Sequence, residues 1–131
     1  MGKVISLFII LLFATFSFAE IIVAEGKIAK NVQNLEPLYD NSTFKKDVGK
    51  VYCFTIIKTD KYPTHIVHLW LHNNDIMAEI PLSVNANKWR TYSSKKISPK
   101  HTGPWRVEVY SEDGKLIDTI KFEVTNGETK L

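Results

Sequence analysis

The sequence has one cysteine, little net charge and no long hydrophobic run after residue 19. Because Cys53 is the single cysteine among the 131 residues, no disulfide can form within the chain. Cys53 lies in the apolar run 51–57, which favours a buried, unreactive thiol over a redox or metal-binding one. The net charge is +3 and the basic residues form no stripe, so the composition excludes a typical nucleic-acid-binding domain.

The chain also lacks the short motifs that mark common catalytic and cofactor sites. It has no Gly-rich phosphate loop and no dinucleotide-binding fingerprint. No nucleophile-elbow motif surrounds Ser93 and Ser94, and Cys53 has no evident activating neighbour. The acidic residues fall mostly in turns or at solvent-facing strand positions, not in pairs suited to glycoside hydrolysis. We therefore expect no enzymatic activity, no catalytic residue and no cofactor.

Residues 1–19 have the pattern of a secretory signal peptide. Lys3 precedes the almost wholly apolar stretch 4–18, and Ala19 supplies a small residue at the position that a signal peptidase reads. The apolar stretch is shorter than the roughly 20 residues that a membrane-spanning helix needs, although a retained N-terminal anchor is the alternative. We expect residues 20–131 to form one exported domain, periplasmic or extracellular, with no membrane span after cleavage.

Short strands separated by turn signals fill the rest of the chain, and no segment of useful length has helical periodicity. About seven strands with closely spaced turns are typical of an all-β protein. We predict a single antiparallel β-sandwich of the immunoglobulin or fibronectin type. The expected strands cover residues 21–30, 51–58, 64–72, 76–84, 89–97, 105–110 and 116–124, with 34–40 as an edge segment or loop. Residues 51–58 are apolar on both faces and should form a central strand, and Asn73-Asn-Asp75 predicts a hairpin turn.

The last two expected strands form the most specific structural pattern. Trp105, Val107 and Val109 share one face of the first strand, and residues 119–124 alternate in the same way after a glycine turn. This ribbon is similar to the closing hairpin of immunoglobulin-like and fibronectin-like sandwiches. Cys53 and Trp70 occupy roughly the places of the core cysteine and tryptophan in those folds, but the second cysteine is absent.

A group of histidines raises the question of a metal site. His65, His68 and His72 lie close together, and a strand places His68 and His72 on one face. A zinc site needs three or four converging ligands, so His101 would have to join them from a distant loop. We expect no metal site, and a metal-binding or enzymatic domain that uses His68 and His72 stays an alternative.

Trp70 has two possible positions. If the strand turned Val67, Leu69 and Leu71 inward, then Trp70 and its two neighbouring histidines would form an outward stripe; otherwise Trp70 is the core tryptophan with His68 beside it. If Trp89 and Trp105 point inward, the residues next to them point outward. Exposed aromatic and arginine side chains dominate binding surfaces. The predicted ligand- or partner-binding residues are His68, Trp70, His72, Arg90, Tyr92 and Arg106.

Ordered elements along residues 24–124 carry a family resemblance. They are His68-Leu-Trp70, Lys88-Trp-Arg-Thr-Tyr-Ser-Ser-Lys95, Gly103-Pro-Trp-Arg-Val-Glu-Val109 and Asp113-Gly114, preceded by Val51-Tyr-Cys-Phe54. Together they resemble a family of exported or membrane-anchored bacterial proteins catalogued as a domain of unknown function, number twenty-nine fourteen. The resemblance implies a compact β-rich extracytoplasmic domain. It implies no activity and no catalytic residues.

These observations favour a non-enzymatic interaction or accessory domain of the bacterial cell envelope, with an unknown protein or glycan as partner. A carbohydrate- or peptidoglycan-binding module that uses Trp70 and Tyr92 is the second hypothesis, because flat aromatic rings suit sugar faces.

Overall fold

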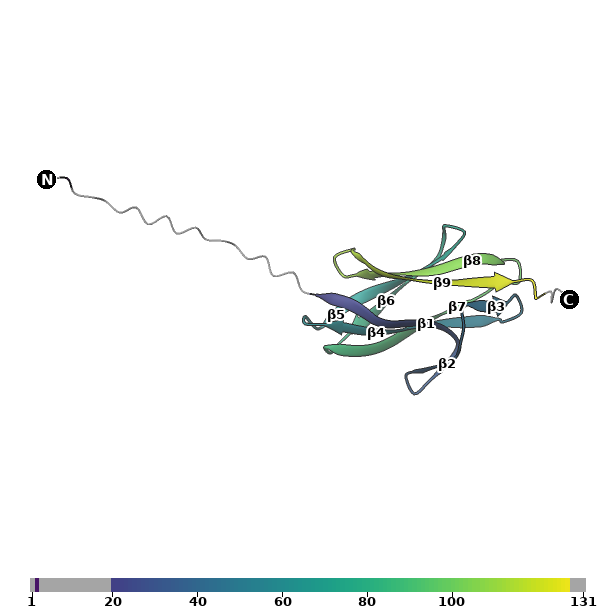
Figure 1. The fold of residues 1–131 in the computed structure, drawn as a ribbon, viewed down its shortest axis with the longest axis horizontal. Coiled ribbons are helices and arrows are strands. Elements are labelled where there is room, and N and C mark those ends of the chain that lie inside the picture. Colours follow the sequence, from purple (N-terminus) through teal and green to yellow (C-terminus); the bar gives the residue numbers. More distant parts are fainter. Residues whose placement is uncertain (1, 3–19, 128–131) are drawn as a thin grey trace.

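The computed structural model describes residue 2 and residues 20–127, and residues 20–127 form a two-layered β-sandwich (Figure 1). The expected signal peptide at residues 1–19 lies outside the described residues, apart from Gly2. No helix in the described part of the chain is long and apolar enough to cross a membrane. The strands are β1 (Ile21–Gln33), β2 (Glu36–Asp40), β3 (Thr43–Lys45), β4 (Lys50–Thr59), β5 (Thr64–His72), β6 (Asp75–Val84), β7 (Lys88–Lys96), β8 (Gly103–Ser111) and β9 (Leu116–Thr125).

The strands divide between two sheets. Sheet A has the order β2-β1-β4-β7, and sheet B has the order β3-β9-β8-β5-β6. All pairings are antiparallel except that between β3 and β9. The expected all-β sandwich is confirmed, with β2 and the short β3 as strands beyond the seven expected. The prediction that β4 is a central strand is also confirmed, and β6, which carries Pro81, lies at a sheet edge as a proline favours.

The core lies between the two sheets and follows the strand alternation. On β8, Trp105, Val107 and Val109 are buried, as predicted, while the residues between them face outward. Each large apolar side chain buried in this way contributes about 1.5–3 kcal/mol. The core residues from the other strands are Ile28, Phe44, Val51, Cys53, Ile57, Ile66, Trp70, Val84, Phe122 and Val124.

Two hairpins turn through left-handed backbone conformations. Asn73 and Asn74 have φ values of 48° and 71°, which agrees with the predicted Asn-rich turn between β5 and β6. Asn34 and Leu35, with φ values of 52° and 56°, make the same kind of two-residue turn between β1 and β2. Leucine is unfavourable there because its Cβ crowds the backbone at positive φ.

The turn of the β1–β2 hairpin is held against the outer face of sheet A at β7, and Figure 1 shows β2 outside the layer of β1 and β4. Arg90 of β7 donates a hydrogen bond from Nη1 to the carbonyl oxygen of Leu35 at 3.0 Å, and its guanidinium also pairs with Glu36. The Arg90 guanidinium also lies over the ring of Phe54, 6.0 Å from its centroid. Phe54 points away from the core but is buried, because Arg90 and its surroundings cover it.

The two sheets meet closely where β1 passes β9. Gly26 of β1 has no side chain, and a Cβ added to it would lie 2.5 Å from Cδ1 of Ile120 on β9. A side chain at position 26 would therefore force the Ile120 side chain to shift, so glycine is favoured at this point of closure. Asp118, on the same face of β9 as Ile120, also lies near Gly26.

Candidate functional site

A buried hydrogen-bond chain joins the two sheets and contains the most chemically distinctive side chains of the sequence. Trp70 Nε1 donates to Ser93 Oγ at 3.0 Å, and Ser93 Oγ lies 2.7 Å from His68 Nδ1. The other ring nitrogen of His68, Nε2, lies 3.2 Å from Thr55 Oγ1, which donates to the carbonyl oxygen of Thr91 at 3.4 Å. Because β5 belongs to sheet B and β4 and β7 to sheet A, this chain ties the layers together.

The two ends of this hydrogen-bond chain determine which of its atoms carry the protons. The Trp70 indole can only donate, and the Thr91 carbonyl can only accept. Thr55 therefore uses its proton on Thr91 and accepts from His68 Nε2–H, so the Ser93 hydroxyl donates to an unprotonated His68 Nδ1. The arrangement satisfies every member and requires a neutral imidazole.

Burial keeps His68 neutral. Its side chain is fully enclosed, and desolvation lowers the pKa of His68 from 6.5 to about 4. Protonation at Nδ1 would also leave the Ser93 hydroxyl without an acceptor. A serine next to a histidine resembles a catalytic pair. Ser93 is only 5% exposed, however, and its oxygen already accepts a hydrogen bond from the Trp70 indole. It therefore presents no nucleophile to a substrate.

Of the two positions considered for Trp70, the structure shows the core position with His68 beside it, and the outward stripe of His68, Trp70 and His72 does not form. His68 and Trp70 are both fully buried, and Val67 and Leu69 take the outward positions of β5. The alternation of β5 is therefore opposite to the arrangement that would expose Trp70, because the polar chain supplies partners for the indole N–H and the imidazole inside the core. Neither residue can contact a partner, so both leave the candidate binding surface.

His72 lies outside this chain, at the end of β5, in an aromatic cluster. Its ring centroid is 4.8 Å from that of Trp105 and 5.1 Å from that of His101. His72 Nε2 lies 2.7 Å from the carbonyl oxygen of Thr102, and Trp105 Nε1 donates to that of His101 at 2.8 Å. These bonds fasten the loop before β8 to the sheet, so His72 and His101 are only partly exposed.

The histidines do not form the three-ligand group that a zinc site needs. His68 is in the core, while His72 and His101 lie together near Trp105. Within residues 20–127, no group of three or more His, Cys, Asp or Glu side chains could hold a metal ion. Burial raises the pKa of the Cys53 thiol, with a smaller contribution from the nearby Asp118, which does not favour the thiolate that metals bind.

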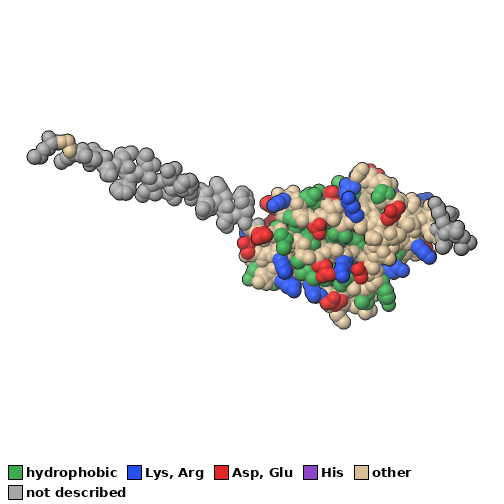
Figure 2. Space-filling model, viewed as in Figure 1, with side chains coloured by type: hydrophobic (Ala, Val, Ile, Leu, Met, Phe, Trp, Pro, Cys, Tyr) green, Lys and Arg blue, Asp and Glu red, His purple; other side chains and the backbone are tan. Residues whose placement is uncertain are grey.

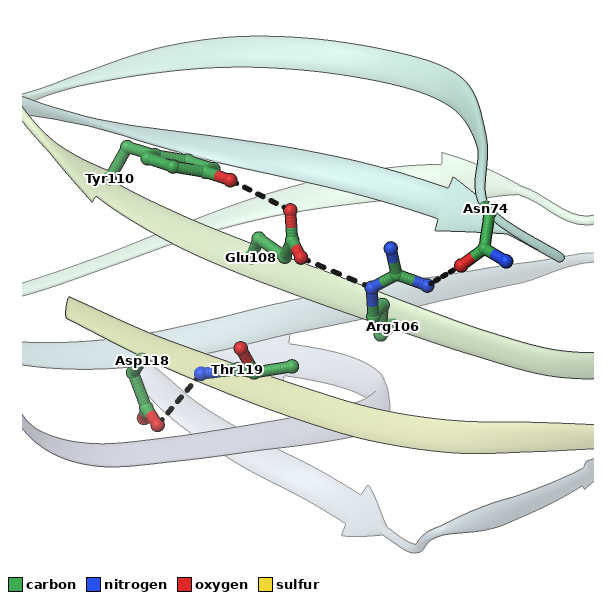
Figure 3. A network of polar contacts seen from close by, with 6 residues as sticks. All are labelled: Asn74, Arg106, Glu108, Tyr110, Asp118 and Thr119. Carbon is green, nitrogen blue, oxygen red and sulfur yellow. Dashed lines mark hydrogen bonds and ion pairs between the residues drawn. The ribbon is translucent and has the colours of Figure 1, made fainter. Parts of the chain in front are cut away.

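Arg106 belongs to a polar network on the outside of sheet B (Figure 3). Its Nε donates to Glu108 at 3.1 Å, and its Nη1 donates to the side-chain oxygen of Asn74 at 2.7 Å. The Tyr110 hydroxyl donates to the other oxygen of Glu108 at 2.8 Å, and this hydrogen bond raises the pKa of the tyrosine. Arg106 also lines an open groove of about 640 Å³ with Asn73, Asn74 and Lys121, among others. Its donors are thus partly used within the protein.

Arg90 and Tyr92 point outward from sheet A, as predicted, while Trp89 packs against the core and is only partly buried. Arg90 is occupied by the β1–β2 hairpin. Tyr92 is 41% exposed, and its ring lies 6.0 Å from that of Tyr52 on β4. Lys50 stands over the Tyr52 ring at 5.2 Å. Of the two predicted residues on sheet A, Tyr92 is the exposed one, and Tyr52 and Lys50 extend its surface without belonging to the predicted set.

The six predicted residues therefore do not form one site. His68 and Trp70 are internal, His72 lies at the end of β5, and Arg90 with Tyr92 lies on the outer face of sheet A, whereas Arg106 is on sheet B. Sequence reasoning missed Ser93 and Thr55 as partners of His68, and Tyr52 as the neighbour of Tyr92. The one sequence signal for these contacts was the presence of Ser93 within the Lys88–Lys95 element. The positions of Thr55 and Tyr52 beside β7 follow only from the pairing of β4 with β7.

Residues 63–124 are the part of the chain with a recognisable family relationship. They match the family described as protein of unknown function (DUF2914). The resemblance found in the sequence is thus confirmed for β5 to β9, and the matched segment begins after β4. It contains His68, Trp70, Ser93 and Trp105, which all lie in the core. No curated protein matches the chain.

Several solved structures are similar in part. A β-glucosidase from Listeria innocua in complex with glucose has 11% identity and a TM-score of 0.45, over 83% of this chain and 16% of the enzyme. A β-glucosidase from Kluyveromyces marxianus has 10% identity and a TM-score of 0.47, over 84% of this chain and 15% of that one. The chain thus spans only about a sixth of the length of these enzymes.

Proposed function

We propose that this chain is an exported, non-enzymatic interaction domain of the bacterial cell envelope. The observation that carries the proposal is that the serine and histidine side chains suited to catalysis are hydrogen-bonded within the fold. In the core, the Ser93 hydroxyl is hydrogen-bonded to both His68 and Trp70. The His72 ring is hydrogen-bonded to the carbonyl oxygen of Thr102. Side chains used in this way stabilise a framework, and function is left to the exposed surface.

The outer face of the β4–β7 ladder is the surface that we assign to binding. Tyr52 and Tyr92 lie at its centre, with Lys50 next to them. Tyrosine contributes a large contact area at a small cost in side-chain entropy, and it is frequent in binding hot spots. The signal-peptide pattern of residues 1–19 and the resemblance to an exported family support a place in the cell envelope.

The carbohydrate-binding alternative has lost one of its two proposed contacts, because Trp70 is enclosed in the core. The remaining aromatic pair, Tyr52 and Tyr92, has ring planes inclined by 59°. Two rings so inclined do not make one flat platform for a sugar face. An interaction with protein is therefore the function that the surface supports better.

Site-specific photo-crosslinking in the cells that make the protein tests the proposal. A crosslinking amino acid at position 92 is expected to give a discrete adduct in the envelope fraction, whereas the same amino acid at Lys121, exposed on sheet B, gives none. Identical adducts from both positions, or a cytoplasmic location of the protein, would contradict it. N-terminal sequencing of the envelope form is expected to begin at Glu20.

A further inference from the structure

We infer that the free edge of β7 binds an extended acidic polypeptide segment as an additional strand of sheet A. The inference rests on the proposed function as an interaction domain and names the partner of that surface. Three features of the molecule carry it: the unpaired main chain of β7, two pairs of opposed lysines on the β4–β7 ladder, and Tyr92 between them.

The first feature is the edge itself. β7 is the last strand of sheet A, and no strand among residues 20–127 pairs with its other side. The Asn87 carbonyl accepts from Thr59, and the Ile97 amide donates to Gly49, so residues of odd number direct their main-chain groups toward β4. Since the two sides of an antiparallel strand alternate, Lys88, Arg90, Tyr92 and Ser94 direct their N–H and C=O groups to the free edge.

The second feature is the presence of two pairs of directly opposed lysines. The register places Lys50 opposite Lys96 at one end of the β4–β7 ladder and Lys58 opposite Lys88 at the other. All four are exposed, and in the described part of the chain none of them forms a salt bridge. Like charges directly opposite one another destabilise a sheet, so carboxylates brought near either pair would relieve the repulsion.

These features specify the spacing of the partner. Lys88 and Lys96 are on the same face as Tyr92, and at about 3.4 Å per residue they stand roughly 27 Å apart. A strand on the β7 edge would place acidic side chains next to each lysine pair if its acids were about eight residues apart. An apolar or aromatic residue midway between these acids would lie beside Tyr92.

The same lysines disfavour a second copy of this chain as the occupant. Two β7 edges paired antiparallel about Tyr92 would set Lys88 of each copy opposite Lys96 of the other. Lysine on an edge strand is a common protection against such self-association. An acidic strand has the charge opposite to that of the four lysines, and main-chain pairing favours a polypeptide over a polyanion without amide groups.

A labelled synthetic peptide tests the inference by fluorescence anisotropy. The peptide has about eleven residues, with glutamates near both ends, leucine at the centre and threonine elsewhere. We expect saturable binding that weakens with added salt. Two control peptides separate the contributions: replacing both glutamates by glutamine, or N-methylating alternate backbone amides to prevent strand pairing, should each weaken binding at least roughly tenfold.

Charge reversal on the protein supplies the matched variants. The double variant Lys88→Glu, Lys96→Glu should lose the acidic peptide and bind its lysine-substituted counterpart, while Lys121→Glu on sheet B should behave as wild type. The reversed residues face Lys58 and Lys50, so we expect the double variant to fold.

Three results would overturn the inference. Equal binding of the N-methylated peptide, or full competition by a polyphosphate, would show a polyanion surface without strand addition. Absence of binding by the acidic peptide would reject the acidic partner. If a position-92 crosslink nevertheless formed in cells, the proposed interaction function would stand with a partner of other chemistry.

Discussion

His68 of sheet B and Ser93 of sheet A are joined by a contact of 2.7 Å between Nδ1 and Oγ, in the middle of the core. Removing the serine hydroxyl leaves both the Trp70 indole N–H and the His68 Nδ1 without partners. Each buried unpaired group costs about 1–3 kcal/mol. We therefore expect Ser93→Ala to lower the free energy of unfolding by about 2–4 kcal/mol. Urea denaturation measures this difference, with Ser94→Ala on the outer face as the control; equal midpoints for the two variants would contradict it.

The pH dependence of stability should report the buried imidazole. The folded-state pKa of His68, about 4, lies below the unfolded value of 6.5, so the unfolded chain binds more protons between these values. The stabilisation is fully present above about pH 6.5 and is lost as pH falls toward 4, to a total of about 3 kcal/mol. We expect the difference in unfolding free energy between wild type and His68→Gln to shrink over this window. A difference that stays constant from pH 7 to 4 would refute the neutral, buried imidazole.

Cys53 should be chemically silent in the native protein. Desolvation, aided by the charge of Asp118, raises the pKa of its thiol, and the side chain has no exposed surface. We expect a thiol-specific reagent to label it only as fast as the protein unfolds globally, and to react at once in concentrated urea. Cysteine placed at the partly exposed Ser94, in a Cys53→Ser background, is the control that should label rapidly. Rapid native labelling of Cys53 would show that the core opens locally.

The contact between Gly26 and Ile120 should behave as a coupled pair. A Cβ at position 26 would lie far inside van der Waals distance of Ile120, so Gly26→Ala should cost about 1–3 kcal/mol through overpacking. In an Ile120→Val background, the same change should cost less, because the Cδ1 atom responsible for the closest contact is gone. A double-mutant cycle by thermal denaturation measures the coupling. Additive effects would indicate that the sheets move apart to accommodate the Cβ atom and that positions 26 and 120 are not coupled.

The turn at Leu35 offers a test of backbone strain. Because φ is positive there, Leu35→Gly should be more stable than Leu35→Ala by about 1 kcal/mol, although both remove the same apolar side chain. The matched pair at Ala29, which is buried in the regular part of β1, should show the opposite order: Ala29→Gly is expected to destabilise the wild-type protein. Unfolding midpoints provide the comparison, and equal stability of the two Leu35 variants would argue against the left-handed turn.

The sequence predicted the features that depend on neighbouring residues. The alternation of Trp105, Val107 and Val109 and the asparagine turn at Asn73 carry local signals, and the structure confirms both. The side of β5 that faces the core could not be decided locally, because both faces of the strand mix apolar and polar side chains. Its orientation depends on hydrogen-bond partners from β4 and β7, which lie far away in the sequence.

The lysine pairs were hidden for a related reason. Lys50 and Lys96 become neighbours only through the long-range pairing of β4 with β7, and nothing near either residue indicates that partner. The turn at Leu35 escaped prediction because leucine is unfavourable at positive φ, and the interactions of Arg90 with the hairpin accompany that conformation.

The position of β9 in sheet B has a consequence for the order in which the chain can assemble. Among the strands of residues 20–127, β9 is made last, yet it pairs with both β3 and β8 and contributes Phe122 and Val124 to the core. A ribosome-bound chain that stops short of β9 cannot complete either the second sheet or the hydrophobic cluster around Phe122. Folding of the sandwich therefore cannot be completed before β9 has been made, and in the exported protein that we propose this delay would keep the polypeptide open for passage through a translocation channel.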